Sequence, residues 1–163
     1  MCSSDLAELS ATSAKFNLGN VARTINIPLL GMMFLHPRVN ARFEFTDGGE
    51  ETIAGRILRK ALYKEAARPT LIKTTRGRDL PLTGVIWIDP FNGTVVKTEM
   101  NAADPTVRCQ VVTTFRLDEA LELWVPEKME EYYKAYSGLD DILATATYTN
   151  VRKILRSDLP EPY

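Results

Sequence analysis

Any chemistry in this chain would have to come from very few reactive side chains. The 163 residues include one histidine, His36, and two cysteines, Cys2 and Cys109. A catalytic histidine needs a nucleophile or an orienting partner, and no motif supplies either. His36 precedes Pro37, so we expect it to cap or pack a helix end. So few histidines and cysteines also exclude most zinc sites, and we expect no catalytic residue, no metal and no cofactor.

The acidic side chains offer two candidate sites. Asp89 precedes Pro90 and could be a lone catalytic acid, but an Asp-Pro turn favours a carboxylate that accepts amide hydrogens. A second group could hold a cation or contact a partner, although a solvated, charged strand edge is the favoured interpretation. This group comprises Glu127, Glu130 and Glu131 with Lys128 and Lys134.

The charge balance argues against a nucleic-acid partner. Lysine plus arginine number 20 and aspartate plus glutamate 21, which gives a formal net charge of −1. A nucleic-acid binder usually carries a clear excess of basic residues on one face. The most basic stretch is therefore interpreted as a solvated ribbon; it contains Arg56, Arg59, Lys60 and Lys64. Cys109 is expected to be a small buried hydrophobe.

The chain is long enough for one domain, and its first residues look foreign to that domain. Residues 1–6 resemble a translated sequencing adapter, so we expect a non-native leader there and a single domain over 7–163. No apolar run reaches the roughly 18 residues of a transmembrane helix. No signal peptide is present, and we expect that it was lost by truncation.

Hydrophobic periodicity predicts helical segments followed by strands. Residues 7–15 are weakly helical, and residues 26–36 carry apolar side chains at helical spacing until Pro37 ends the helix. The period then changes to two. Strands are expected over 40–45, 51–65, 84–89, 94–100, 107–116, 121–125 and 144–149.

Turn residues separate these strands. We expect Asp47–Gly49 to form a hairpin turn, Pro90–Gly93 to form the clearest hairpin, and Asp104–Pro105 to form a further corner. Short connections require antiparallel neighbours. The sequence therefore predicts an α+β domain: a curved, open antiparallel meander of about seven strands, with an N-terminal helical segment packed on its concave face.

The segment Trp87-Ile-Asp-Pro-Phe-Asn-Gly-Thr-Val-Val-Lys-Thr-Glu99 resembles a hairpin of the bacterial lipoprotein-carrier superfamily. That superfamily contains the LolA and LolB carriers and the sensor domain of RseB-type regulators. The later segments 121–129 and 144–150 also resemble its strands, so the resemblance covers roughly residues 40–155. Members have more N-terminal sheet and helix than this chain supplies, which is consistent with an N-terminally truncated gene.

The resemblance implies a half-barrel whose helical lid encloses an apolar cavity for acyl chains. It implies a non-catalytic, periplasmic or otherwise extracytoplasmic carrier whose partner is a lipid or an acylated lipoprotein, with a possible envelope protein partner. Within the hairpin it points to Val85 and Trp87. Together with apolar periodicity it gives the expected cavity lining: Leu30, Met33, Phe34, Val85, Trp87, Val111, Phe115, Leu123 and Tyr148.

Two alternatives stay open. The same fold could be a signalling or structural interaction module, whose marks would be a filled core and an exposed apolar patch. The chain could also be an enzyme of unknown type, for which a cluster of perturbed titratable groups in a cleft would be the sign. Met32, Met33 and Phe34 fit either a variable acyl ligand or ordinary core packing.

Overall fold

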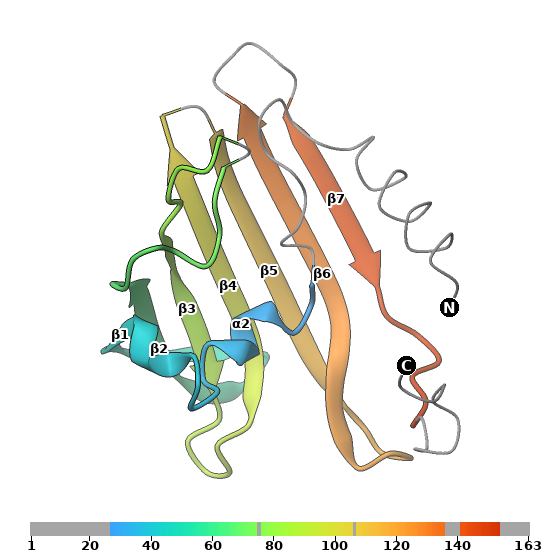
Figure 1. The fold of residues 1–163 in the computed structure, drawn as a ribbon. Helices are drawn as coiled ribbons and strands as arrows, with labels where there is room; N and C mark the ends of the chain where they lie inside the picture. Colours follow the sequence, from blue (N-terminus) through green and yellow to red (C-terminus); the bar gives the residue numbers. More distant parts are fainter. Residues whose placement is uncertain (1–26, 75, 106, 136–140, 154–163) are drawn as a thin grey trace, which may run out of the picture.

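A computed structural model describes residues 27–74, 76–105, 107–135 and 141–153. Their main element is one open antiparallel sheet in which each strand pairs with the next along the chain, as predicted (Figure 1). Its seven strands are β1 (Phe43–Ile53), β2 (Arg56–Glu65), β3 (Leu82–Ile88), β4 (Val95–Asp104), β5 (Val107–Asp118), β6 (Leu123–Ala135) and β7 (Ile142–Thr147).

Helix is scarce among the described residues. The segment predicted as a helix over residues 26–36 contains only α2 (Leu30–Met33), and a short 3-10 turn, η1 (Asn40–Arg42), precedes β1. No side chain caps α2 at Leu29, which agrees with its single turn. The helix predicted over residues 7–15 lies outside the described residues.

The prediction of a turn at Asp47–Gly49 was wrong. Strand β1 continues through these residues, and the register against β2 shifts between Asp47 and Glu50. Gly49 has a φ of 74°, which suits a β-bulge. The chain reverses later, at Ala54 and Gly55, where φ is 48° and 78°. The expected ribbon over 51–65 is thus the end of β1, a tight turn and β2.

The hairpin between β3 and β4 forms where turn chemistry predicted it. Asp89 accepts a hydrogen bond from the Phe91 amide at 2.9 Å, and Gly93 adopts a φ of 73°. Arg56 of β2 adds an ion pair to the Asp89 carboxylate at 2.6 Å. Asp89 therefore has the structural role that its position before proline favoured. The Phe91 amide and the Arg56 guanidinium both lower the pKa of the Asp89 carboxyl.

This pKa shift gives a prediction for stability against pH. Because the folded state lowers the pKa of Asp89, its contribution is present above about pH 4 and is lost as the pH falls through the folded pKa. Asp89→Asn should therefore melt at a lower temperature than the wild type at pH 7. The difference in Tm should shrink on acidification, measured by circular dichroism. A difference that stays constant down to pH 2 would contradict this role.

The basic stretch of β2 is a solvated, ion-paired surface, as interpreted from its sequence. Arg59 pairs with Asp47 at 2.8 Å, and Lys60 pairs with Glu51 at 3.4 Å. Both pairs join β1 to β2; Asp47 and Arg59 are exposed, whereas Glu51 and Lys60 are half-buried. Such exposed or half-exposed pairs contribute little stability each, because solvent screens them.

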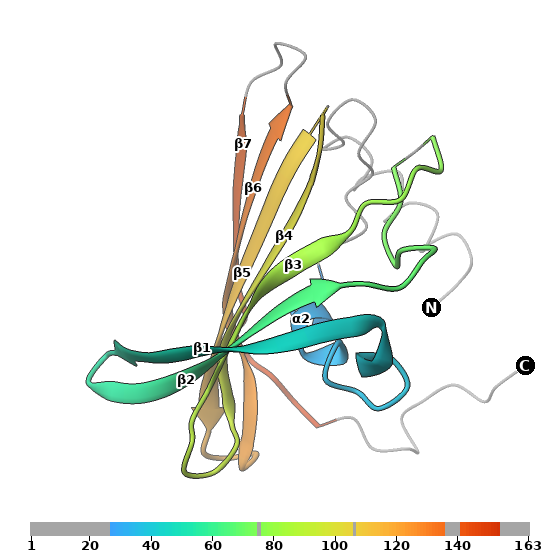
Figure 2. The same cartoon turned by 90° about the vertical axis from the view of Figure 1, so that its left-hand side faces the viewer.

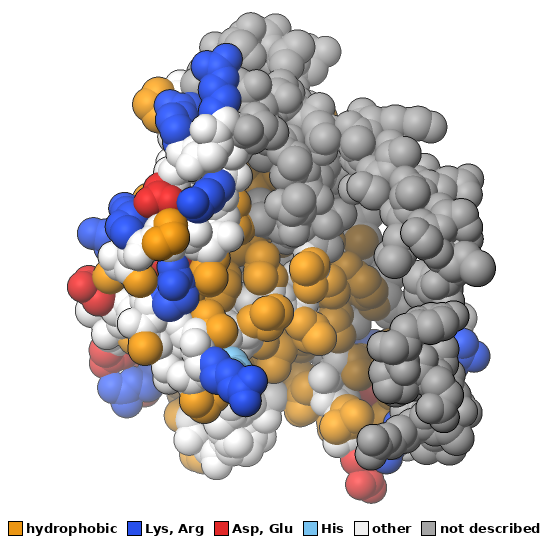
Figure 3. Space-filling view, viewed as in Figure 1, with side chains coloured by type: hydrophobic (Ala, Val, Ile, Leu, Met, Phe, Trp, Pro, Cys, Tyr) orange, Lys and Arg blue, Asp and Glu red, His pale blue; other side chains and the backbone are white. Residues whose placement is uncertain are grey.

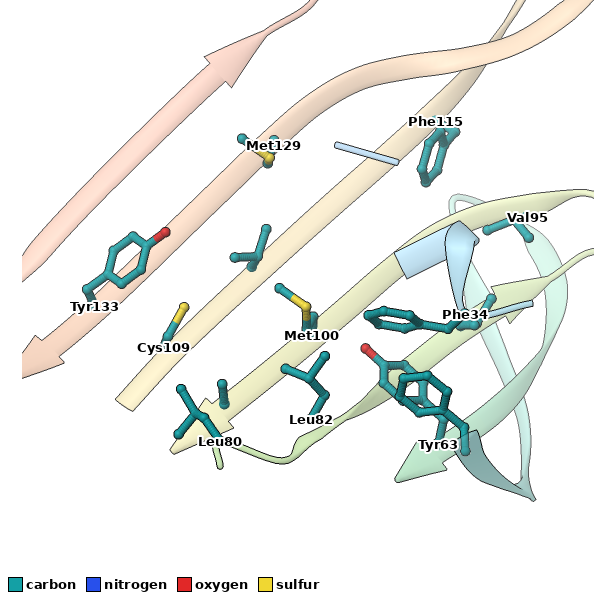
Figure 4. Close-up of a cluster of buried hydrophobic side chains, with 14 residues drawn as sticks. Phe34, Tyr63, Leu80, Leu82, Val95, Met100, Cys109, Phe115, Met129 and Tyr133 are labelled. Carbon is teal, nitrogen blue, oxygen red and sulfur yellow. The ribbon is translucent and has the colours of Figure 1, made fainter. Parts of the chain in front are cut away.

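The hydrophobic core lies on the face of the sheet that carries α2. Figure 2 shows the first hairpin turned steeply against β4–β7, with α2 in the angle between them. A strongly twisted sheet creates such a concave side. Figure 4 shows the buried cluster on this side, which includes Phe34, Tyr63, Leu82, Met100, Cys109, Val111, Phe115, Met129 and Tyr133. Cys109 is 1% exposed, so the prediction of a buried cysteine is confirmed.

Candidate functional site

The close approach of α2 to the sheet depends on Gly31. A Cβ atom at this position would lie 2.8 Å from the Cβ of Thr98 in β4, which is too close for any side chain there. Gly31 itself is buried, whereas Met33 on the same helix is 49% exposed. The helix therefore touches β4 through its backbone and directs larger side chains to either side of the contact.

Phe34, directly after α2, anchors this segment in the core. Its ring lies 4.6 Å from that of Phe43 and 5.3 Å from that of Tyr63, measured between centroids. The Tyr63 hydroxyl passes over Gly84 and donates a hydrogen bond to the Glu99 carbonyl at 2.9 Å. Burial raises the pKa of Tyr63 far above its usual value, so the phenol stays neutral.

A cavity of about 320 Å³ lies beside these rings. Its walls come from three parts of the chain: α2 with the residues that follow it up to Val39, the connection between β2 and β3, and the start of β3. Ligand sites for small molecules usually begin near this volume, and apolar walls with few polar groups are typical of them. The lining residues are Leu30, Met33, Phe34, Val39, Leu71, Ile72, Lys73 and Leu82.

A second, larger hollow of about 650 Å³ lies along α2 and the residues that follow it. Met33 and Val39 line both hollows, so the two share a wall. Figure 3 shows apolar side chains gathered in the middle of the face that carries α2. The second hollow is lined by Leu29, Met32, Met33, Leu35, His36, Arg38 and Val39.

The charges beside the two hollows are positive. Lys73 lines the first and Arg38 the second; both are exposed, and neither forms an ion pair with another described residue. His36 accepts a hydrogen bond from the Arg38 amide at its Nδ1 atom, at 3.2 Å. Its side chain is exposed and lies beyond the end of α2 at Met33, so it neither caps nor packs that helix end as expected. An anionic group could approach this rim without meeting an exposed carboxylate among the lining residues.

A buried carboxylate, that of Glu65, holds in place the connection between β2 and β3 (residues 66–81), which forms one wall of the first cavity. Glu65, at the end of β2, is 1% exposed and accepts the Leu71 amide at 2.7 Å and the Leu82 amide at 3.4 Å. Arg42 lies 3.6 Å from the same carboxylate and also donates to the Pro69 carbonyl. Glu65 thus ties Leu71 of the connection, and the first residue of β3, to the end of β2.

Six of the nine residues expected to line the site lie on the α2 side. Phe34, Val111 and Phe115 belong to the buried cluster, and Leu30 and Tyr148 pack against it. Met33 lies at the surface between the two hollows. Among the described residues that line the two hollows, Val111, Phe115 and Tyr148 do not occur. They belong to the filled core farther along the sheet.

The other three expected residues lie on the opposite face. Ile86 belongs to the core cluster, so its neighbours Val85 and Trp87 point away from it. The Trp87 indole donates to Glu51 at 3.1 Å, and Lys97 lies 4.2 Å from the centre of its ring. Leu123 is 53% exposed and alternates with Trp124, which packs on the core. We therefore leave these three residues out of the proposed site.

The sequence reasoning missed most of the wall formed by residues 66–81. Leu71, Ile72 and Lys73 follow a break at Pro69 and show no periodicity that predicts an element. The available signal was the pair of apolar residues in an otherwise polar connection, together with the alternation of Leu80 and Leu82. Only the contacts through Glu65 bring this segment over the core.

The interpretation of the acidic group in β6 needs a correction. Glu130 and Lys128 are an exposed pair at 2.8 Å, but Glu131 is 4% exposed and β6 is an interior strand. Alternation places Glu131 on the core side, between Met129 and Tyr133, and the Tyr133 hydroxyl donates to it. Burial first, and then the charge of Glu131, raises the pKa of Tyr148.

Two further features concern metals and membranes. Among the described residues, no group of three or more histidine, cysteine, aspartate or glutamate side chains could hold a metal ion. Within the same ranges, no helix has the length and hydrophobicity needed to span a bilayer.

Comparison of the chain with models of known protein families, with curated proteins and with solved structures found no match.

Proposed function

We propose that this chain is a non-catalytic, extracytoplasmic carrier that binds an acyl chain of a lipid or lipoprotein beneath α2. The observation that carries the proposal is the apolar cavity between α2, the 66–81 connection and the sheet. The resemblance to the lipoprotein-carrier superfamily supports it, because that family uses a half-barrel under a helical lid. In this proposal α2 is the lid, and the second hollow, which shares Met33 and Val39 with the cavity, is the entrance.

Burial of an acyl chain would supply enough free energy without any polar contact. At about 0.8 kcal/mol per methylene, a twelve-carbon stretch gains on the order of 10 kcal/mol before the entropic cost of binding. The flexible side chain of Met33 could adapt to chains of different length. Lys73 and Arg38 would face the anionic carboxylate or phosphate of the head group.

Two of the expected site residues form a matched pair of variants for testing the proposal. Met33 lines both hollows and is 49% exposed, whereas Leu123 is 53% exposed on the opposite face. Met33→Asp should weaken dodecanoate binding at least about tenfold, because a carboxylate facing an acyl chain loses solvation. Leu123→Asp should bind as the wild type does. Titration with a fluorescent fatty acid, displaced by dodecanoate, measures both.

Purification provides an independent measurement. Native mass spectrometry of the full chain from a bacterial host should show co-purified lipid, or uptake of added lipid. A protein that takes up no lipid, or equal loss of binding in the Met33 and Leu123 variants, would count against the carrier.

A second candidate is an interaction module with a filled core, and one observation favours it. Val111 and Phe115 are each 4% exposed, so the middle of the core face is packed rather than open. At the same time, α2 and its surroundings expose Leu29, Met33 and Leu35. An exposed apolar patch of this kind is typical of a protein-binding surface. Absence of lipid together with a specific protein partner lost in Met33→Asp would favour this module.

A further inference from the structure

The two edges of the sheet differ in how they are protected against pairing. At the first edge, β1 carries Glu44, Asp47, Glu50 and Glu51 and is interrupted by a bulge. Charges and bulges are the devices that keep an edge strand from pairing with another chain. At the other edge, residues 142–149 read Ile-Leu-Ala-Thr-Ala-Thr-Tyr-Thr, with no charge and no proline. Leu143 in β7 is 80% exposed.

The pairing with β6 shows which backbone N–H and C=O groups of β7 make no hydrogen bond to β6. The Tyr148 amide donates to the Glu127 carbonyl at 2.9 Å, and the register continues with Thr147 opposite Lys128. Hydrogen bonding alternates along an antiparallel pair, so Ile142, Ala144 and Ala146 direct their N–H and C=O groups to β6. The backbone groups of Leu143, Thr145 and Thr147 point away from it. Within the described ranges, no strand pairs with β7 on that side.

We infer that β7 pairs antiparallel with β7 of a second copy of this chain, about a twofold axis at Thr145. The three outward positions are spaced evenly about this residue. A twofold axis there places Thr145 opposite its own copy, and Leu143 opposite Thr147 of the second copy. This register pairs all three outward positions at once and leaves none of their amides without a partner.

The composition of β7 favours its own copy as the partner. An uncharged strand places no like charges opposite each other when it pairs with itself. The same register puts Ala144 opposite Ala146 of the second copy, on the side where Ile142, Ala146 and Tyr148 pack on the core. The apolar faces of the two sheets would therefore continue into each other.

The assembly should stop at two copies. A twofold contact uses the same patch on both chains and closes on itself. Among the described strands, only the two β1 edges then remain, and their acidic side chains and bulge resist further pairing. This inference does not depend on a bound lipid.

A charge swap at the twofold axis tests this geometry. The wild type should sediment as a dimer, while Thr145→Lys and Thr145→Glu should each be monomeric because like charges meet at the axis. An equimolar mixture of the two variants should restore the dimer mass. Thr145→Pro, which removes one outward N–H without adding a charge, should also be monomeric. Thr46→Lys is the matched control, because Thr46 is exposed on the opposite edge strand, and it should remain dimeric.

Analytical ultracentrifugation gives the masses, and circular dichroism shows whether each variant is folded. A wild type that stays monomeric over about a hundredfold range of concentration would overturn the inference. So would a Thr145→Lys protein that remains a dimer, or folded charge variants that form no mixed dimer. Loss of the dimer in Thr46→Lys would instead place the contact at β1 and overturn it as well.

Discussion

Replacing Phe34 with alanine is expected to lower the free energy of unfolding by about 3–5 kcal/mol. The side chain is 1% exposed and packs against Phe43 and Tyr63, so its removal leaves a cavity that the rigid sheet cannot close. The loss should be large because Phe34 is also the anchor of α2. Chemical denaturation followed by tryptophan fluorescence and by circular dichroism gives the difference.

The matched control is the same substitution at Phe91. This residue is 92% exposed at the tip of the β3–β4 hairpin, so Phe91→Ala should change stability by no more than about 0.5 kcal/mol. If Phe34→Ala proved as mild as Phe91→Ala, the segment after α2 would not be packed in the core, and the proposed lid would lose its basis.

Replacing Glu65 with alanine should cost a similar amount, about 3–5 kcal/mol, for a different reason. Its carboxylate is the acceptor for the Leu71 and Leu82 amides, and it faces Arg42. Removal leaves two amides without their acceptor and a partly buried guanidinium without its counter-charge. Equilibrium unfolding in urea measures the change.

Two further variants test which part of the Glu65 side chain is needed and whether its position matters. Glu65→Gln keeps one carbonyl oxygen as an acceptor and should lose distinctly less stability than Glu65→Ala. Glu44→Ala, at an exposed position of β1, should have little effect. Equal losses in Glu65→Gln and Glu65→Ala would show that the second oxygen and the charge do the stabilising. Hydrogen exchange at Leu71 should also accelerate in Glu65→Ala if the connection is released.

The sequence by itself determined the order of the strands and the place of several turns between them, while strands such as β1 and β6 end well beyond the predicted limits. Pro90–Gly93 and Asp104–Pro105 encode reversals through local backbone preference, and both occur where they were predicted. Short connections then require neighbouring strands to be antiparallel, which gives the meander. The turn prediction was wrong at Asp47–Gly49, because the same residue types that make a turn also make a bulge.

The tertiary structure alone decided which residues share a face. In Gly84–Ile88 both the odd and the even positions are apolar. The alternation of residue types therefore does not predict that Ile86 faces the core while Trp87 faces the other side. Register shifts at three places, including one between Thr114 and Phe115, also change which residues of a strand point to the core. The wall formed by Leu71 and Ile72 depends on a carboxylate elsewhere in the chain, Glu65. Local propensity acts over a few residues, whereas a face or a cavity exists only once distant segments are brought together.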